Sequence, residues 1–225
     1  MPIFQQDQLF AQNFSFWPHL TPTEQQLLRE NSHIAAYPAY QQIHSSESEC
    51  LGVVLVLSGQ LRSYMLSEGG RDITLYRVYP GDICILSAAC ALSNITFEVT
   101  VDAQEESELL IINPAAFQKL VETNIYVECF SYQQSTMRFS DFVWAMQQIL
   151  FMSFDKRLAI FLLDESSKLG SLQLKLTHEQ IAKYMGSARE VVTRMLKYFS
   201  EEKIVKLARG QIQILDKQKL RDMVK

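Results

Sequence analysis

Residues 176–216, LTHEQIAKYMGSAREVVTRMLKYFSEEKIVKLARGQIQILD, carry two helix-start signals separated by a glycine. The first is Thr-His-Glu-Gln at residues 177–180, a capping box in which threonine and glutamine satisfy two amide groups at the start of a helix. The second, Ser-Ala-Arg-Glu at residues 187–190, follows the same rule. Gly186 lies between them, and glycine readily adopts the positive φ that ends a helix. Two short capped helices joined by a glycine turn predict a helix-turn-helix unit.

Short strands are predicted on both sides of this unit. Leucines at positions 172, 174 and 176 alternate with polar residues, as in a half-buried strand. Apolar residues at 204–207 and 212–214 flank Arg209-Gly210 and predict a β-hairpin wing. Asp216 can then cap a last helix.

The formal charge divides the chain into an acidic body and a basic C-terminal part. The 225 residues have a net charge of −4. Residues 1–170 carry 9 Lys/Arg against 19 Asp/Glu, a net of −10, whereas residues 171–225 carry 12 against 6, a net of +6. This asymmetry is expected when only the C-terminal domain meets a polyanion. An uneven spread of solvated surface charge is the plainer alternative.

The second predicted helix separates into an apolar face and a polar face. At about 100° per residue, the polar face holds Arg189, Glu190, Thr193, Arg194 and Lys197. The apolar face holds Val192, Met195, Leu196 and Phe199. Arginine can bond guanine twice, glutamate can accept from the cytosine amino group, and a threonine methyl can contact a thymine methyl. The polar face therefore predicts a helix that reads base edges in the major groove, the alternative being a simple Glu190–Arg194 surface pair.

Three further residues complete the candidate DNA-binding set. Thr177 and Ser187 open the two predicted helices, where free amides and the positive end of the helix dipole suit phosphate contacts. Arg209 lies in the turn of the predicted wing.

The middle of the chain predicts one long helix. Asn113-Pro114 is a helix-start signal, and residues 124–152 contain neither glycine nor proline. A helix over these residues would be about 43 Å long, more than a small domain needs. Its apolar stripe consists of Phe139, Phe142, Val143, Met146, Ile149 and Leu150. We expect Phe139, Phe142, Met146 and Ile149 to form a dimer interface, the alternative being a core helix packed on its own β domain. Asp155 and Gly170 then mark the start and end of a helix over residues 156–168.

Residues 33–112 predict short strands joined by tight turns. Apolar runs at 51–57, 61–66, 73–78 and 109–112 are separated by turn sequences, among them Gly-Gly at 69–70 and Pro-Gly at 80–81. Between them, residues 97–102 alternate between apolar and polar. Strands of about five residues at a spacing of about 8 to 12 are typical of a sandwich, jelly roll or barrel.

The run at residues 176–216 resembles the winged helix of the cyclic-AMP receptor protein and FNR (CRP/FNR) family of bacterial transcription regulators. Arg189, Glu190 and Arg194 match the Arg-Glu-x-x-x-Arg pattern of the receptor-protein branch. The resemblance covers nearly the whole chain and implies an α+β fold. Its parts would be a β-roll (jelly-roll, cyclic-nucleotide-binding-like) sensor domain over residues 1–123, a dimerisation helix over 124–153 and a winged helix-turn-helix domain over 154–225. It also implies a TGTGA-like half-site, repeated as a palindromic operator in double-stranded DNA.

The sensor part departs from the nucleotide-binding members of this family. Those members hold the cyclic phosphate with an Arg followed by Ser or Thr, whereas this chain has no Lys or Arg between Arg77 and Lys119. A phosphate there would be desolvated without a cation, so we do not expect cyclic AMP to bind. The FNR branch holds an iron–sulfur cluster with clustered N-terminal cysteines, but the first cysteine here is Cys50, so that cluster is not expected either. Histidines and methionines are available for haem, but no spacing favours it.

Cys84 and Cys90 flank the residues ILSAA, where nucleotide-binding relatives hold their ligand. One interpretation is that both are small buried hydrophobes. The other is a thiol switch or soft-metal site that senses an oxidant, nitric oxide or an electrophile. Neighbouring isoleucines and leucines would equally suit a small apolar effector. The sequence therefore names no cofactor, and no CxxC pair predicts a metal site.

We therefore expect a homodimeric, cytoplasmic transcription regulator that is not an enzyme. No apolar run reaches the roughly 18 residues of a membrane span, and the first ten residues do not form a secretory signal. RNA polymerase would be a further partner if the protein activates transcription. One alternative is a β-roll (cupin-like) metal-dependent enzyme, although the predicted strands at 51–112 contain no histidine ligand. Another is a constitutive regulator with a degenerate sensor domain.

Overall fold

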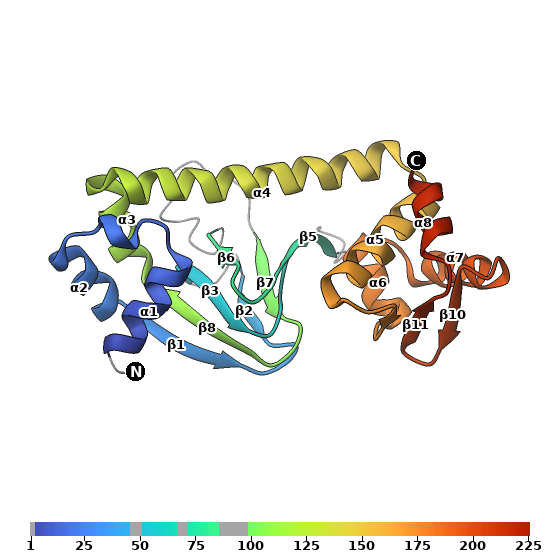
Figure 1. Ribbon diagram of the computed structural model, residues 1–225, viewed down its shortest axis with the longest axis horizontal. Helices are drawn as coiled ribbons and strands as arrows, with labels where there is room; N and C mark the ends of the chain where they lie inside the picture. Colours follow the sequence, from blue (N-terminus) through green and yellow to red (C-terminus); the bar gives the residue numbers. More distant parts are fainter. Residues whose placement is uncertain (1–2, 46–50, 67–71, 86–98) are drawn as a thin grey trace. The chain divides into compact units, whose positions relative to one another are not determined.

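The computed structural model describes residues 3–45, 51–66, 72–85 and 99–225 (Figure 1). The chain forms two compact units, one of Met1–Leu66 with Leu75–Phe142 and one of Ser67–Thr74 with Val143–Lys225. Each unit has its own hydrophobic core. The predicted α+β fold, with a β-rich domain, a long helix and a helix-turn-helix, is confirmed.

Two four-stranded sheets form the β-roll of the first unit. One sheet has the strand order β1 (Ser32–Tyr37), β8 (Ser107–Ile112), β3 (Val53–Ser58), β6 (Ile83–Cys84). The other has the order β2 (Gln42–His44), β7 (Thr100–Ala103), β4 (Leu61–Leu66), β5 (Asp72–Val78). Within the first sheet, β3 pairs antiparallel with both β6 and β8.

Strand β3 is buried on both faces, which explains its continuous apolar sequence. Val53 and Leu55 belong to the core cluster shared with the N-terminal helices. Val54 and Val56 belong to a second cluster that also contains Leu61 of β4 from the other sheet. The β-roll therefore has two apolar layers. One lies between its two sheets, and the other lies between the first sheet and the N-terminal helices.

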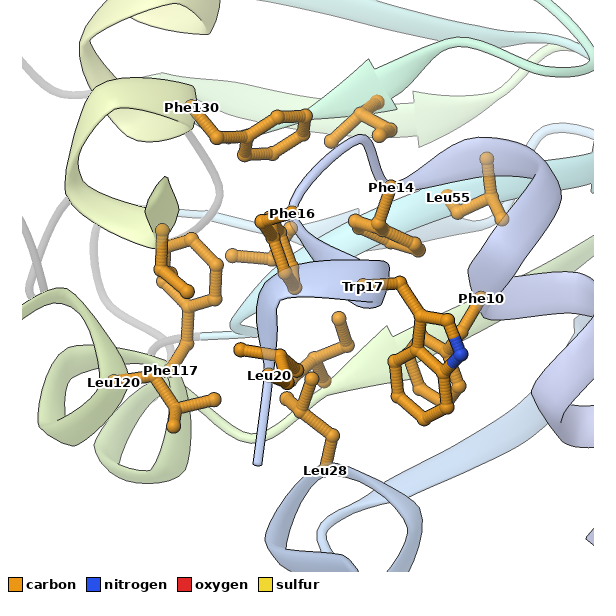
Figure 2. Packing of buried hydrophobic residues seen from close by; sticks show 14 of the residues in the cluster. Phe10, Phe14, Phe16, Trp17, Leu20, Leu28, Leu55, Phe117, Leu120 and Phe130 are labelled. Carbon is orange, nitrogen blue, oxygen red and sulfur yellow. The ribbon is translucent and has the colours of Figure 1, made fainter. Parts of the chain in front are cut away.

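Three helical segments that we did not predict from the sequence precede β1. They are α1 (Ile3–Asn13), the 3-10 helix η1 (Trp17–His19) and α2 (Pro22–Glu30). Figure 2 shows that they bring Phe10, Phe14, Phe16 and Trp17 into one aromatic cluster with Phe117 and Phe130. The rings of Phe10 and Trp17 stack with centroids 4.7 Å apart. This cluster fixes the N-terminal segment on the β-roll.

Two helices leave the β-roll in succession. As expected, Asn113 caps α3 (Pro114–Thr123), its side chain accepting from the amides of Ala115 and Ala116. The long helix α4 (Ile125–Phe151) has 27 residues, slightly fewer than the predicted range. Its buried residues, Val127, Phe130 and Ser131, all lie in the first two turns.

The second unit contains the predicted winged helix. It consists of α5 (Phe154–Leu169), β9 (Gln173–Leu174), α6 (His178–Met185), α7 (Arg189–Glu201), β10 (Val205–Ala208), β11 (Gln211–Ile214) and α8 (Lys217–Val224). The three strands form a sheet of order β10-β11-β9. Asp216 caps α8 as predicted, accepting from the amide of Lys219 at 2.9 Å.

One predicted helix start and one predicted strand differ from the structure. Helix α5 begins at Phe154 after the N-cap Ser153, and Asp155 lies inside its first turn instead of capping it. A hydrogen bond from Ser153 lowers the pKa of Asp155, and the charged carboxylate also suits the positive end of the helix. The strand predicted over 172–176 is reduced to Gln173–Leu174.

The second predicted capping box does not form. It would require the backbone amide of Ser187, which instead bonds to the end of α6. Gly186 adopts φ of 58°, and the amide of Ser187 donates to the carbonyl of Ala182 at 2.9 Å. This bond completes the C-terminal cap of α6, so α7 begins one residue later with Ala188 at its N-cap and no side-chain cap bond. The first capping box, Thr177 with Gln180, is present.

Candidate nucleic-acid interface

Helices α6 and α7 are held in a fixed turn by contacts at both ends of α6. At its start, Thr177 accepts from the amide of Gln180 at 3.1 Å. At its end, the guanidinium of Arg157 on α5 donates to the carbonyl of Met185 at 2.7 Å. The first bond fixes where α6 begins, and the second ties the end of α6, just before α7, to α5.

Helix α7 presents its polar side chains on one exposed face. Val192, Leu196 and Phe199 are fully buried in the core of the second unit. The opposite face is a shallow depression lined by Arg189, Glu190, Thr193, Arg194 and Lys197. All five of these residues are exposed, and the structure thus brings together the whole set predicted for base contacts.

The ion pairs that these side chains form with neighbouring residues leave the face accessible to a ligand. No ion pair links the exposed residues Glu190 and Arg194, so the simple surface pair considered as an alternative does not form in this part of the described chain. Lys197 lies 4.0 Å from Glu201, a contact between two well-exposed groups that adds little stability. We refer to the five α7 residues that line this depression as the reading face.

The first turn of α6 contacts the reading face through two residues that the sequence analysis missed. His178 Nδ1 lies 3.0 Å from Thr193 Oγ1. Glu179 lies 3.9 Å from Arg189 Nε in an exposed ion pair. Both contacts join residues ten or more positions apart, so no local pattern could have indicated them.

The remaining predicted phosphate contacts lie around this face. Thr177 is exposed at the start of α6, with its hydroxyl committed to the capping box, and Ser187 is half-buried beside Arg189. Arg209 is exposed in the turn between β10 and β11, where Gly210 has φ of 70°. The wing thus carries one cation at its tip.

In the β-roll, Cys84 is buried next to a tyrosine hydroxyl. Its Sγ lies 3.6 Å from the Tyr76 oxygen, and burial, followed by the interaction with Cys84, raises the pKa of Tyr76 well above its usual value. These neighbours agree with a buried structural thiol. Cys90 lies outside the described residues.

Two arginines from other parts of the chain, outside residues 78–118, place guanidinium groups in the β-roll. Arg62 of β4 is buried, lies 3.9 Å from Asp102 and has its guanidinium 4.3 Å from the centre of the Tyr64 ring. Arg138 of α4 donates to the Ile83 carbonyl at 3.1 Å and pairs with Asp141 at 3.2 Å. Each guanidinium therefore already has a carboxylate partner.

The predicted dimer stripe of α4 is exposed within the chain. Phe139, Phe142, Met146 and Ile149 expose between 38% and 67% of their surface, which is unusual for large apolar residues. The first turns of α4 pack on the β-roll through Val127 and Phe130, and Arg138 further along the helix donates to the Ile83 carbonyl. The stripe itself is exposed within the chain, which favours the dimer interface over a core helix.

Two models of known protein families match the chain. The Crp-like helix-turn-helix domain matches residues 156–223, and the cyclic nucleotide-binding domain matches residues 35–124. A crystal structure of a regulator assigned to the crp/fnr family, from Eubacterium rectale, is 42% identical with a TM-score of 0.89, covering 95% of this chain and 99% of that one. The chain belongs to the CRP/FNR family of transcriptional regulators.

Three further proteins are similar to this chain at lower identity. The transcriptional activator protein FnrA of Stutzerimonas stutzeri is 25% identical over 175 residues, which are 73% of this chain and 69% of that protein. The transcriptional regulator SdrP of Thermus thermophilus is 25% identical over 75% of this chain and 81% of its own length. FixK2 of Bradyrhizobium japonicum, at 18% identity and a TM-score of 0.71 over 86% of this chain and 98% of that one, shares the fold.

Neither a metal-ligand cluster nor a membrane-spanning helix occurs in the described parts of the chain. No three His, Cys, Asp or Glu side chains in these parts of the chain converge as a metal site would require. No helix among them is both long and apolar enough to cross a membrane.

Proposed function

We propose that this CRP/FNR regulator acts as a homodimer on a palindromic operator with a TGTGA-like half-site. The observation that carries the proposal is the reading face, where Arg189, Glu190 and Arg194 all point away from the core of the second unit. Arg189 and Arg194 would each bond a guanine, while Glu190 would accept from the cytosine paired with one of them. Thr177, Ser187 and Arg209 would position the domain on the phosphates.

The proposal is tested by titrating the full-length protein with a TGTGA palindrome and a scrambled duplex of the same composition. Specific binding by a regulator is typically about 10³-fold or more tighter than non-specific binding at physiological salt. We expect at least this preference for the palindrome. Equal affinity for the two duplexes would reject the operator assignment.

The dimer would use the exposed stripe of α4. A helix of this length spans about 40 Å, and recognition helices of a dimer must lie about 34 Å apart to enter successive major grooves. We infer that residues 124–153 join two sensor domains (1–123) and set the spacing of two DNA-binding domains (154–225). A signal bound by the β-roll would then shift the population of DNA-competent orientations.

Cyclic AMP is not expected to be the signal, although the β-roll has the nucleotide-binding fold. No cation lies between Arg77 and Lys119 in the sequence, and the guanidinium groups of Arg62 and Arg138 already contact Asp102 and Asp141. At millimolar cyclic AMP we expect no heat of binding and no rise in melting temperature. A ligand at about 100 times its dissociation constant would add about 2.7 kcal/mol of stability, so a shift of several degrees would refute this prediction.

A redox signal through Cys84 and Cys90 is the second candidate. Because Cys84 is buried, an oxidant would need a local opening of the β-roll to reach it. If the thiols sense oxidants, replacing both by serine will make DNA affinity insensitive to mild peroxide while the parent protein responds. The same response in both proteins would make these cysteines ordinary core residues.

The regulator assignment is favoured over the cupin-like enzyme because the similar proteins are named as transcriptional regulators. A regulator of chromosomal genes acts in the cytoplasm, and RNA polymerase would be its partner if it activates transcription. Equal DNA affinity of freshly prepared and extensively dialysed protein would instead favour a constitutive regulator.

A further inference from the structure

His178 reaches from the first turn of α6 to the centre of the reading face. Its Nδ1 atom lies 3.0 Å from Oγ1 of Thr193, a residue 15 positions further along the chain. The imidazole is half-buried, whereas Thr193 is exposed. The contact thus joins a half-buried ring to an exposed side chain of the reading face.

The surroundings of the imidazole favour its uncharged form. Burial lowers the pKa of His178, and the positive charge of Arg189 on the neighbouring helix lowers it further. Glu179, beside His178 in the sequence, pairs with Arg189. In the uncharged ring, Nδ1 can donate to the Thr193 hydroxyl or accept from it, according to the tautomer.

This bond restricts what Thr193 can offer to a base. A threonine in a helix normally populates two side-chain rotamers, and the hydroxyl and methyl groups point in different directions in each. The hydrogen bond between the hydroxyl and His178 selects one rotamer. In that rotamer the methyl group, and not the hydroxyl, is available to contact a base. A methyl group in the major groove recognises the C5 methyl of thymine.

We propose that His178 is a positioning residue for base recognition: it holds the Thr193 hydroxyl so that the Thr193 methyl group contacts a thymine of the half-site. The inference rests on the proposed function and adds a specificity contact to it. Arg189, Glu190 and Arg194 account for guanine and cytosine contacts, and His178 with Thr193 accounts for a neighbouring thymine.

Deoxyuridine scanning tests the proposal, because uracil lacks only the C5 methyl of thymine. Each thymine of the palindrome is replaced in turn by deoxyuridine, and the affinity of the full-length protein is measured. Burying one methyl group contributes about 0.8 kcal/mol, or about fourfold in affinity. We expect the parent protein to lose about fourfold per half-site at one thymine and little at the others.

Four single variants and one double variant then separate positioning from direct contact. Thr193→Ser, which lacks the methyl, should bind the thymine and uracil duplexes equally. Thr193→Val carries methyl groups at both γ positions, so it should keep the preference and lose none of it when His178→Ala is added. With Thr193 unchanged, His178→Ala should reduce the preference for thymine over uracil. His178→Asn, whose amide can occupy the place of Nδ1, should retain it. Unchanged melting temperatures would show that each variant is folded.

Several results would overturn the inference. If His178→Ala weakens all duplexes equally and leaves the thymine preference intact, His178 contacts phosphate. If His178→Ala also reduces the thymine preference in the Thr193→Val background, it does not act through the threonine hydroxyl. If the parent prefers the palindrome over a scrambled duplex but shows no loss with deoxyuridine at any position, this inference fails and the proposed function stands. If the parent shows no preference for the palindrome, both fail.

Discussion

Met146→Glu is expected to convert the dimer into a monomer. In the proposed interface, the two α4 helices bury this side chain against its symmetry mate, and a carboxylate there would have no cation to compensate it. An uncompensated buried charge costs about 3 kcal/mol or more, so the dimer dissociation constant should rise by about 100-fold or more. Sedimentation equilibrium of the full-length protein measures this directly. Operator affinity should fall with it, because a monomer engages one half-site.

Gln148→Glu is the matched control for this substitution. Position 148 follows Met146 by two residues, which places it about 200° around the helix, away from the apolar stripe. The same charge added there should leave the protein dimeric. If Met146→Glu also sediments as a dimer at micromolar concentration, the interface does not lie on this stripe.

Arg189→Ala should remove a large part of the sequence preference. A bidentate arginine–guanine contact contributes about 1 to 3 kcal/mol per half-site, so operator affinity should fall by about fivefold to 150-fold for each half-site. The contact of Arg189 with Glu179 should not offset this, because an ion pair between two exposed groups contributes little. The decisive readout is discrimination at one base pair, which should become flat in competition binding with singly substituted operators.

Lys197→Ala provides the comparison, since Lys197 lies at the edge of the same reading face. A phosphate contact weakens binding to all sequences alike and reduces the slope of log affinity against log salt by about one. If Arg189→Ala instead showed this uniform loss, with discrimination intact, the assignment of Arg189 to a base would be wrong.

The winged helix could be predicted from the sequence because its signals are local. A capping box, a glycine turn and a hairpin each depend on a few adjacent residues, and the 3.6-residue period separates the buried and exposed faces of α7. The mistakes arise where two local rules compete for one residue. Ser187 could cap α7 or complete the end of α6, and in the structure its amide does the latter.

Features that depend on distant residues could not be predicted in this way. The helices before β1 are fixed by aromatic packing with Phe117 and Phe130, which follow more than a hundred residues later. Only α2 carried a local signal, since Thr21 and Glu24 form a capping box that was overlooked. The contact of Arg138 with the Ile83 carbonyl likewise brings a cation to the β-roll across 55 positions of sequence.

The same distinction applies to the candidate site. Periodicity placed all five side chains of the reading face on one exposed surface. It could not show that α6 contacts two of them, because the His178–Thr193 and Glu179–Arg189 contacts depend on how the two helices cross.

The central claim, that a dimer reads a twofold-symmetric operator through α7, is tested most directly by selecting bound sequences from a pool of random duplex DNA with the full-length protein. The account predicts that the enriched sequences share a palindrome whose half-sites resemble TGTGA and whose centres lie about one helical turn apart, about 10 base pairs. Enrichment of asymmetric sites, or of palindromes without a GTG or TGA core, would contradict it.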